Sequence, residues 1–154
     1  MSSIYLGKNS QHHDVTTRVA HEFAHCNSRQ LIRGVLDDNA RGVFQGQVRV
    51  APHAQKTDGQ QMSRALLLSR DAEADAKPEL EIFADDVVCS HGATVGELDE
   101  THLFYLRSRG ISEANARAML IEAFLIEALS EIRHVGFAEM FRPFVSGWQA
   151  SAKG

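Results

Sequence analysis

Alternation of apolar and polar side chains in the first part of the chain limits its fold most strongly. Val15 and Val19 lie at even spacing in one run, and Val48 and Val50 flank Arg49 in another. This period of two places one face of a strand in a core and the other face in water. No amphipathic helix separates the runs, so the pattern does not favour alternating βαβ units. Residues 1–93 are therefore expected to be strands joined by turns.

An acidic run follows the same period and raises the question of calcium binding. The run consists of Asp71, Glu73, Asp75, Glu79 and Glu81. It lacks the sharp-turn glycine and the spaced final glutamate of an EF-hand loop. A solvated strand face is the preferred interpretation.

A faint internal echo hints at a repeating architecture. Residues 36–40 (LDDNA) resemble residues 84–88 (ADDVV). Two coils of a β-solenoid, at roughly 20–25 residues each, would give this offset. Because paired aspartates are also common in turns, the echo alone does not establish a solenoid.

From residue 99 onward the sequence predicts helices. A first helix runs from Asp99 to Arg107 and stops at Gly110, and Ser112 is a favourable N-cap for a second. The second helix has no glycine or proline up to Ile132 and is apolar over more than half of its girth. Such a helix is either sandwiched in a core or covered by another chain, and the pattern leaves both open. It is expected to end near residues 133–134, and residues 143–154 to form a disordered tail.

Composition favours one soluble domain and excludes several classes of function. The chain has 154 residues, of which 44% are hydrophobic and 23% are charged. No apolar run approaches the ~20 residues of a membrane span. The basic residues are scattered, which argues against nucleic-acid binding. No Walker loop is present, and Ser63, Ser69 and Ser90 lack a nucleophile-elbow context. With two cysteines and no visible export signal, a cytoplasmic location with free thiols is expected.

The densest group of metal-binding residue types lies near the N-terminus. It consists of His12, His13, His21, His25 and Cys26. Imidazole and thiolate suit zinc and iron, but the spacing fits no common local zinc pattern. The competing interpretation is that these histidines lie on the outer face of a sheet.

A second candidate is the Cys89-Ser90-His91-Gly92 string. If this segment is a strand, Cys89 and His91 point to the same side. A thiol and an imidazole on one face can ligate iron or zinc, and a protonated imidazole would favour the reactive thiolate. Gly92 would let a backbone or a ligand come close. The competing interpretation makes Cys89 a small buried apolar residue.

Several long strings resemble the SufD branch of the SufB/SufD family, over roughly residues 10–135. They are residues 54–60 (AQKTDGQ), 66–69 (LLLS), 73–82 (EADAKPELEI), 89–96 (CSHGATVG) and 104–111 (FYLRSRGI). The related SufB proteins carry a Glu-His-Glu-Ala-Thr type of string where this chain has Ser-His-Gly-Ala-Thr. The resemblance therefore points to the SufD branch.

The resemblance implies a right-handed parallel β-helix followed by a small helical domain. The implied boundaries are residues 1–97 for the β-helix, 98–142 for the helical domain and 143–154 for the tail. It implies a cytoplasmic, non-catalytic scaffold subunit of a SufBCD complex, with SufB and the SufC ATPase as partners. No tightly bound cofactor is implied, although an iron–sulfur cluster can form transiently at the SufB interface.

Residue roles follow from the same resemblance. His91 and Cys89 match interface positions where the nascent cluster is thought to form, and they are the metal-ligand candidates. The SufC-docking candidates are Phe104, Tyr105, Arg107, Arg109, Met119, Leu120 and Phe124. SufD proteins are much longer, so the chain is expected to match only their last third. Two alternatives stay open, namely an independent histidine-rich metal module and a purely structural solenoid fragment.

Overall fold

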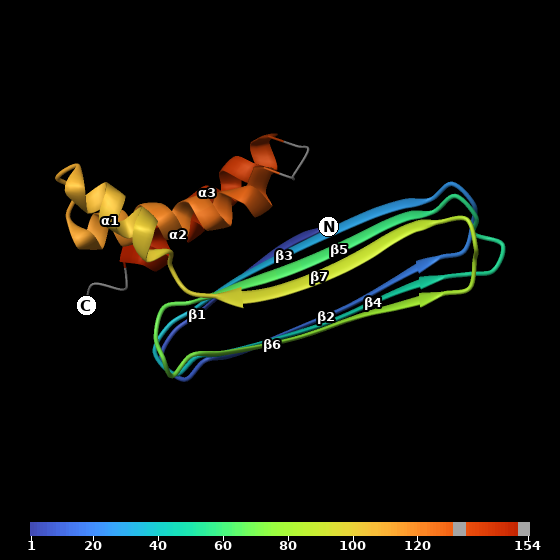
Figure 1. Cartoon of the computed structure of the whole chain (residues 1–154), viewed down its shortest axis with the longest axis horizontal. Helices are drawn as coiled ribbons and strands as arrows, with labels where there is room; N and C mark the ends of the chain where they lie inside the picture. Colours follow the sequence, from blue (N-terminus) through green and yellow to red (C-terminus); the bar gives the residue numbers. More distant parts are fainter. Residues whose placement is uncertain (131–134, 151–154) are drawn as a thin grey trace.

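The computed structural model describes residues 1–130 and 135–150, and its first part is a parallel β-solenoid of about three turns (Figure 1). One sheet has the strand order β1-β3-β5-β7 and the other the order β2-β4-β6. The strands are β1 (Ser2–Gly7), β2 (His12–His21), β3 (Asn27–Leu36), β4 (Arg41–Val50), β5 (Asp58–Leu67), β6 (Glu73–Ile82) and β7 (Val88–Gly96). This confirms the expected strands and the solenoid that the resemblance implied.

Each turn of the solenoid is longer than the internal echo suggested. The register pairs residue 12 with residue 41 and residue 58 with residue 88, so one turn takes about 30 residues. The two Asp-Asp pairs lie in turns of different kinds, Asp37-Asp38 between β3 and β4 and Asp85-Asp86 between β6 and β7. The echo is therefore a similarity between unrelated turns and does not report the repeat.

Two apolar clusters fill the solenoid, and polar side chains lie between them. One cluster is built around Tyr5, Ile32 and Phe44, and the other around Val48 and Val50. The buried side chains between the clusters are Thr17, Gln30, Gln61 and Ser63, and we call these four residues the polar belt. The interior is therefore not uniformly apolar, because a layer of hydrogen-bonding groups crosses it.

Three helices follow the solenoid, and the second packs on the outer face of the β1-β3-β5-β7 sheet (Figure 1). They are α1 (Glu100–Ser108), α2 (Glu113–Ser130) and α3 (Val135–Ala150). The cluster between α2 and the sheet contains Val35, Leu66, Ile121, Leu125 and Leu129. The broad apolar girth of α2 is thus largely explained within the chain, because the sheet covers one side of it.

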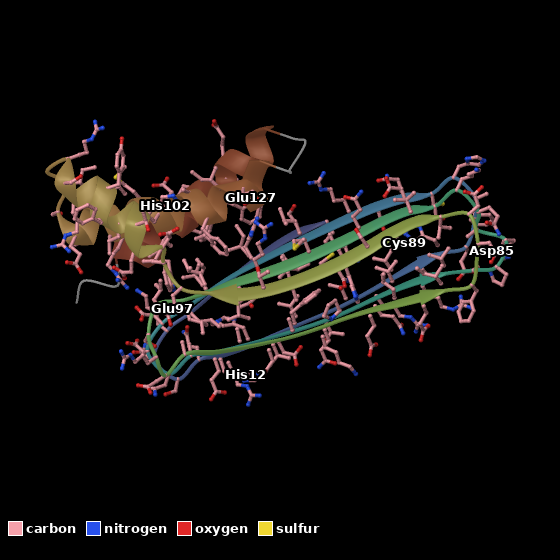
Figure 2. All side chains as sticks on the ribbon, in the orientation of Figure 1. His12, Asp85, Cys89, Glu97, His102 and Glu127 are labelled. Atoms are coloured by element: carbon pink, nitrogen blue, oxygen red, sulfur yellow. The ribbon has the colours of Figure 1, made fainter. Side chains whose placement is uncertain are left out.

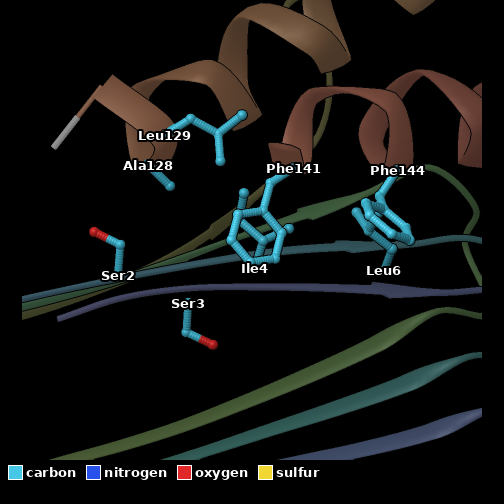
Figure 3. Close-up of a pocket in the computed structure, with 8 residues that line it drawn as sticks. All are labelled: Ser2, Ser3, Ile4, Leu6, Ala128, Leu129, Phe141 and Phe144. Atoms are coloured by element: carbon cyan, nitrogen blue, oxygen red, sulfur yellow. The ribbon is translucent and has the colours of Figure 1, made fainter. Parts of the chain in front are cut away.

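Residues 143–150, expected to belong to a disordered tail, form the second half of α3 instead. Phe141 and Phe144 of α3 lie over Ile4 and Leu6 of β1 and line a small pocket with them, while Ser3 points to the other side of the strand (Figure 3). Trp148 packs against the same cluster as α2. Pro143 lies inside this helix, and Phe144 remains 69% exposed although it lines the pocket. The predicted end of the second helix at residues 133–134, and residues 151–154, lie outside the described residues.

A buried cation ties α2 to the solenoid. Arg33 on β3 is fully buried and forms an ion pair with Glu127 on α2. The Arg33 guanidinium also lies 4.9 Å from the centre of the Phe124 ring. Burial lowers the pKa of Arg33, and the Glu127 carboxylate opposes that shift. The helical part is therefore fixed to the sheet by a charge pair as well as by apolar packing.

Candidate functional site

Strand β7 places Cys89 and His91 on the inner face of the solenoid. Cys89 is the register partner of Gly59, and His91 is the partner of Gln61. A Cβ at Gly59 would lie 3.3 Å from the Cys89 Sγ and 3.5 Å from the Val48 Cγ1 of the opposite sheet, so the thiol lies between the sheets. Figure 2 marks Cys89 near the start of β7. Because successive strand residues alternate in direction, His91 shares this face. The geometry agrees with the predicted one-sided pair.

The surroundings of the thiol are partly apolar and partly polar. Cys89 is half-buried and packs beside Val48 and Val50. The point where a Gly59 Cβ would lie is also 3.7 Å from the His21 Nε2. That nitrogen is hydrogen-bonded to the Ser28 Oγ at 2.8 Å. Gly59 therefore keeps open a small space that the thiol shares with a buried imidazole.

His91 lies at the open end of the solenoid. Within the described residues, β7 and β6 are the edge strands at the C-terminal end of the stack, and β1 and β2 are the edge strands at the other end. His91 is exposed, whereas its register partner Gln61 is buried. The chain thus presents a thiol and an imidazole where the stack of turns ends.

Two donors do not complete a metal site. The described residues contain no group of three or more histidine, cysteine, aspartate or glutamate side chains placed to hold a metal ion. A tetrahedral zinc or iron centre takes four ligands. If Cys89 and His91 bind a metal, other molecules must supply the remaining ligands.

Gly92 has a different role from the one expected. A Cβ at this position would lie 2.8 Å from the Met62 Cε and 3.1 Å from its Sδ. The space beside Gly92 is therefore occupied by a methionine of the neighbouring strand and is not left for a ligand.

The N-terminal histidines are not gathered into one site. His12 and His25 are exposed, but His13 stacks on Tyr5 with ring centres 6.1 Å apart. His21 is buried against Ser28, and Cys26 is half-buried. The expectation that all of these histidines lie on an outer sheet face is wrong for His13 and His21, because both fall on inward positions of β2.

The acidic run belongs to a solvated face, as predicted. Glu73, Asp75, Glu79 and Glu81 on β6 are exposed, and so is Asp71 before it. Asp75 accepts a hydrogen bond from the Arg41 Nη2 at 2.7 Å. Arg41 of β4 therefore pairs with Glu73 and Asp75 of the neighbouring strand.

The helical end exposes apolar side chains. Phe104 and Tyr105 on α1 and Met119 on α2 are exposed large apolar residues. Arg107 lies 3.3 Å from Glu113, and Arg109 donates a hydrogen bond to the Tyr105 hydroxyl at 2.8 Å. Asp99 is the N-cap of helix α1, and its carboxylate accepts hydrogen bonds from the backbone amides of residues 101 and 102. These bonds lower the pKa of Asp99.

Two docking candidates on α2 are less accessible. Leu120 is half-buried, and Phe124 is half-buried against Arg33 and the cluster under α2. A change at Phe124 would therefore disturb the contact between helix and sheet as well as any docking surface. The accessible part of the predicted docking set is centred on α1.

The comparisons with known proteins decide the family. The model for the SUF system FeS cluster assembly SufBD core domain matches residues 1–124. The chain belongs to this SufBD family. It is 49% identical to the iron–sulfur cluster assembly protein SufD of Escherichia coli over 126 residues, which is 82% of this chain and 30% of that protein.

Other relatives agree. SufD of Bacillus subtilis is 35% identical over 130 residues, covering 84% of this chain and 30% of that protein. A SufBD family protein of Synechocystis is 42% identical over 133 residues, covering 86% of this chain and 29% of that protein. The expected SufD resemblance is confirmed, and the chain spans about a third of the length of these relatives. No described helix is long and apolar enough to cross a membrane.

Sequence reasoning missed the buried glutamines and the cation under α2. Gln30 and Gln61 are register partners, and so are Arg33 and Arg64. Aligning residues 27–36 (NSRQLIRGVL) with residues 58–67 (DGQQMSRALL) places these pairs at the same positions. That alignment carries the signal of the repeat, which the Asp-Asp echo obscured.

Proposed function

We propose that this chain is a non-catalytic scaffold part of an iron–sulfur cluster assembly complex, with SufB and the SufC ATPase as partners. Membership of the SufBD family and similarity to SufD proteins support a role in cluster assembly. The observation that carries the finer proposal is the Cys89–His91 pair on the inner face of an edge strand.

The pair would act as half of a ligand set. Thiolate and imidazole are both ligands of iron–sulfur clusters. The described residues contain no group of three or more histidine, cysteine or carboxylate side chains that could hold a metal ion. A partner that covers the open end would supply the missing ligands, and the cluster would be the cargo of the complex and not a resident cofactor.

The edge of the solenoid supports partner docking at this place. An edge strand presents unpaired backbone donors and acceptors, which another chain can extend. Docking of a SufB-type strand along β7 would bring its side chains beside Cys89 and His91. Both cysteines of this chain are free, which fits the reducing cytoplasm that we propose as the setting.

The helical end would receive the ATPase subunit. Phe104, Tyr105 and Met119 are exposed, Arg107 lies in the last turn of α1, and Arg109 at its C-cap hydrogen-bonds Tyr105. An apolar centre with a charged rim is typical of a protein–protein interface. ATP hydrolysis would take place in the partner, because this chain has no phosphate-binding loop.

The test is cluster assembly by this chain purified together with SufB and SufC. His91→Ala and Cys89→Ala are expected to lower the amount of assembled cluster while the subunits stay associated. His12→Ala and Cys26→Ala are matched controls, because exposed His12 begins β2 in the other sheet and Cys26 precedes β3, which β5 separates from β7. These controls are expected to leave assembly unchanged.

Two outcomes would contradict the proposal. If the β7 variants assemble as much cluster as the controls, the chain has only a structural part in the complex. If the control variants lower assembly and the β7 variants do not, the cluster depends on another region of the chain.

A further inference from the structure

A buried carboxamide without a partner lies one strand behind His91. Gln61 is 2% exposed, and neither its Oε1 nor its Nε2 has a hydrogen-bond partner among the described residues. Buried polar groups are nearly always hydrogen-bonded, because leaving one without a partner costs free energy. An amide in this state has an unused donor and an unused acceptor.

The strand opposite leaves room for this side chain. A Cβ at Gly46 of β4 would lie 2.3 Å from the Gln61 Nε2 and 2.8 Å from its Cδ. A larger residue at position 46 would collide with the carboxamide and with the Phe44 ring, whose Cζ would lie 2.5 Å from that Cβ. The Gln61 side chain therefore crosses the polar belt from β5 to β4, and the absence of a side chain at Gly46 permits that placement.

The register brings His91 onto the same layer. Gln61 and His91 are partners on adjacent parallel strands, about 4.8 Å apart, and both occupy inward positions. The imidazole is exposed at the edge strand, so it can turn inward onto the carboxamide. One ring nitrogen would then face Gln61, and the other would face the open end.

We infer that Gln61 is a positioning residue for His91. Its carboxamide hydrogen-bonds one ring nitrogen, which sets the tautomer and directs the other nitrogen outward to a ligand. Side chains behind a metal-binding histidine commonly fix its tautomer and ring orientation in this way. The importance of this role for assembly rests on the proposed function of His91, but the hydrogen bond itself does not.

The test is the tautomer ratio of His91, read from the ¹⁵N chemical shifts of the imidazole in the purified chain. The measurement is made at about pH 8.5, where an ordinary imidazole is neutral. Gln61→Met keeps the length of the side chain and removes both polar atoms. It is expected to change the tautomer ratio of His91 about fivefold, the effect of one net hydrogen bond.

Gln30→Met is the matched control, because Gln30 is equally buried, has the same unpartnered amide atoms and lies one strand further from His91. It is expected to leave the ratio unchanged. If Gln61→Met does not fold, the smaller Gln61→Ser removes the carboxamide without adding volume and is expected to change the tautomer ratio in the same direction.

A ratio that does not respond to Gln61→Met or to Gln61→Ser overturns the inference, as does an equal response to Gln30→Met. If the ratio responds while His91→Ala leaves cluster assembly intact, the hydrogen bond exists and the proposed function fails. The two failures are therefore distinguishable.

Discussion

The ion pair under α2 gives the sharpest stability prediction, and the change that tests it is Glu127→Gln. Arg33 is fully buried, whereas the Glu127 side chain is 52% exposed. Arg64 lies 3.8 Å from the same carboxylate, and the Phe124 ring covers the Arg33 guanidinium. Replacing the carboxylate leaves a buried cation with only a neutral amide and an aromatic face as partners.

The magnitude follows from these contacts. Removing one partner of a fully buried ion pair costs about 3–5 kcal/mol. Because Glu127 is half exposed and the glutamine still accepts a hydrogen bond, we expect about 2 kcal/mol, within the range for hydrogen bonds to charged groups. For a chain of this length that is a fall in Tm of about 4–8 °C. The assay is thermal unfolding followed by circular dichroism.

The control is Glu122→Gln, the same change on the same helix. A second variant, Arg33→Met with Glu127→Gln, replaces the pair and is expected to recover part of the loss, because an apolar side chain carries no buried charge. If Glu127→Gln melts within about 1 °C of the control, the Arg33–Glu127 ion pair contributes nothing measurable to stability. The conclusion that this pair fixes α2 to the sheet would then be wrong.

Three further predictions follow from particular residues. Burial raises the pKa of Tyr5, so the stability that its neutral form contributes is present below pH 10.0 and is lost as the pH rises above that value. In an alkaline titration of stability, Tyr5→Phe should therefore lose less stability above pH 10.0 than the unsubstituted chain, and identical profiles would contradict the prediction. Leu125→Ala should lower the free energy of unfolding by about 2–5 kcal/mol in urea titrations, because Leu125 is fully buried; a cost below about 1 kcal/mol would mean that α2 is not packed there. Phe104→Asp should abolish co-purification with SufC without changing Tm. Phe23 is the control, because it is 75% exposed and Phe104 is 74% exposed, and Phe23→Asp should leave co-purification intact. Equal effects of the two changes would show that α1 is not part of the docking surface.

The strands could be predicted locally because each has one face in the core and one in water. The alternation around Val15, Val48 and Leu80 needed no tertiary information. The length of a solenoid turn could not be predicted this way, because it depends on which strands stack. Both Asp-Asp pairs lie in turns, but these turns do not occupy equivalent positions in the solenoid. The echo between them therefore suggested a repeat that was too short.

The Cys89–His91 pair was predicted from its spacing in a strand, and the structure places both residues on the inner face. The environment behind them was not predicted. Gln61 and His21 reach this face from strands 30 and more residues earlier in the chain, and nothing in the local pattern links them to β7. The helix over residues 143–150 was missed for a similar reason, because Phe144 and Trp148 lie beside Ile4 and Leu6 from the opposite end of the sequence.

Direct ligation of the cluster by His91 is the claim most worth measuring first. The chain would be labelled with ¹⁵N-histidine, assembled with unlabelled SufB and SufC, and the reduced cluster examined by pulsed electron paramagnetic resonance. We predict a ¹⁵N coupling to the cluster that disappears in His91→Cys, a variant that keeps a ligand at this position. A cluster without ¹⁵N coupling in the unsubstituted chain, or a coupling that persists in His91→Cys, would contradict the account.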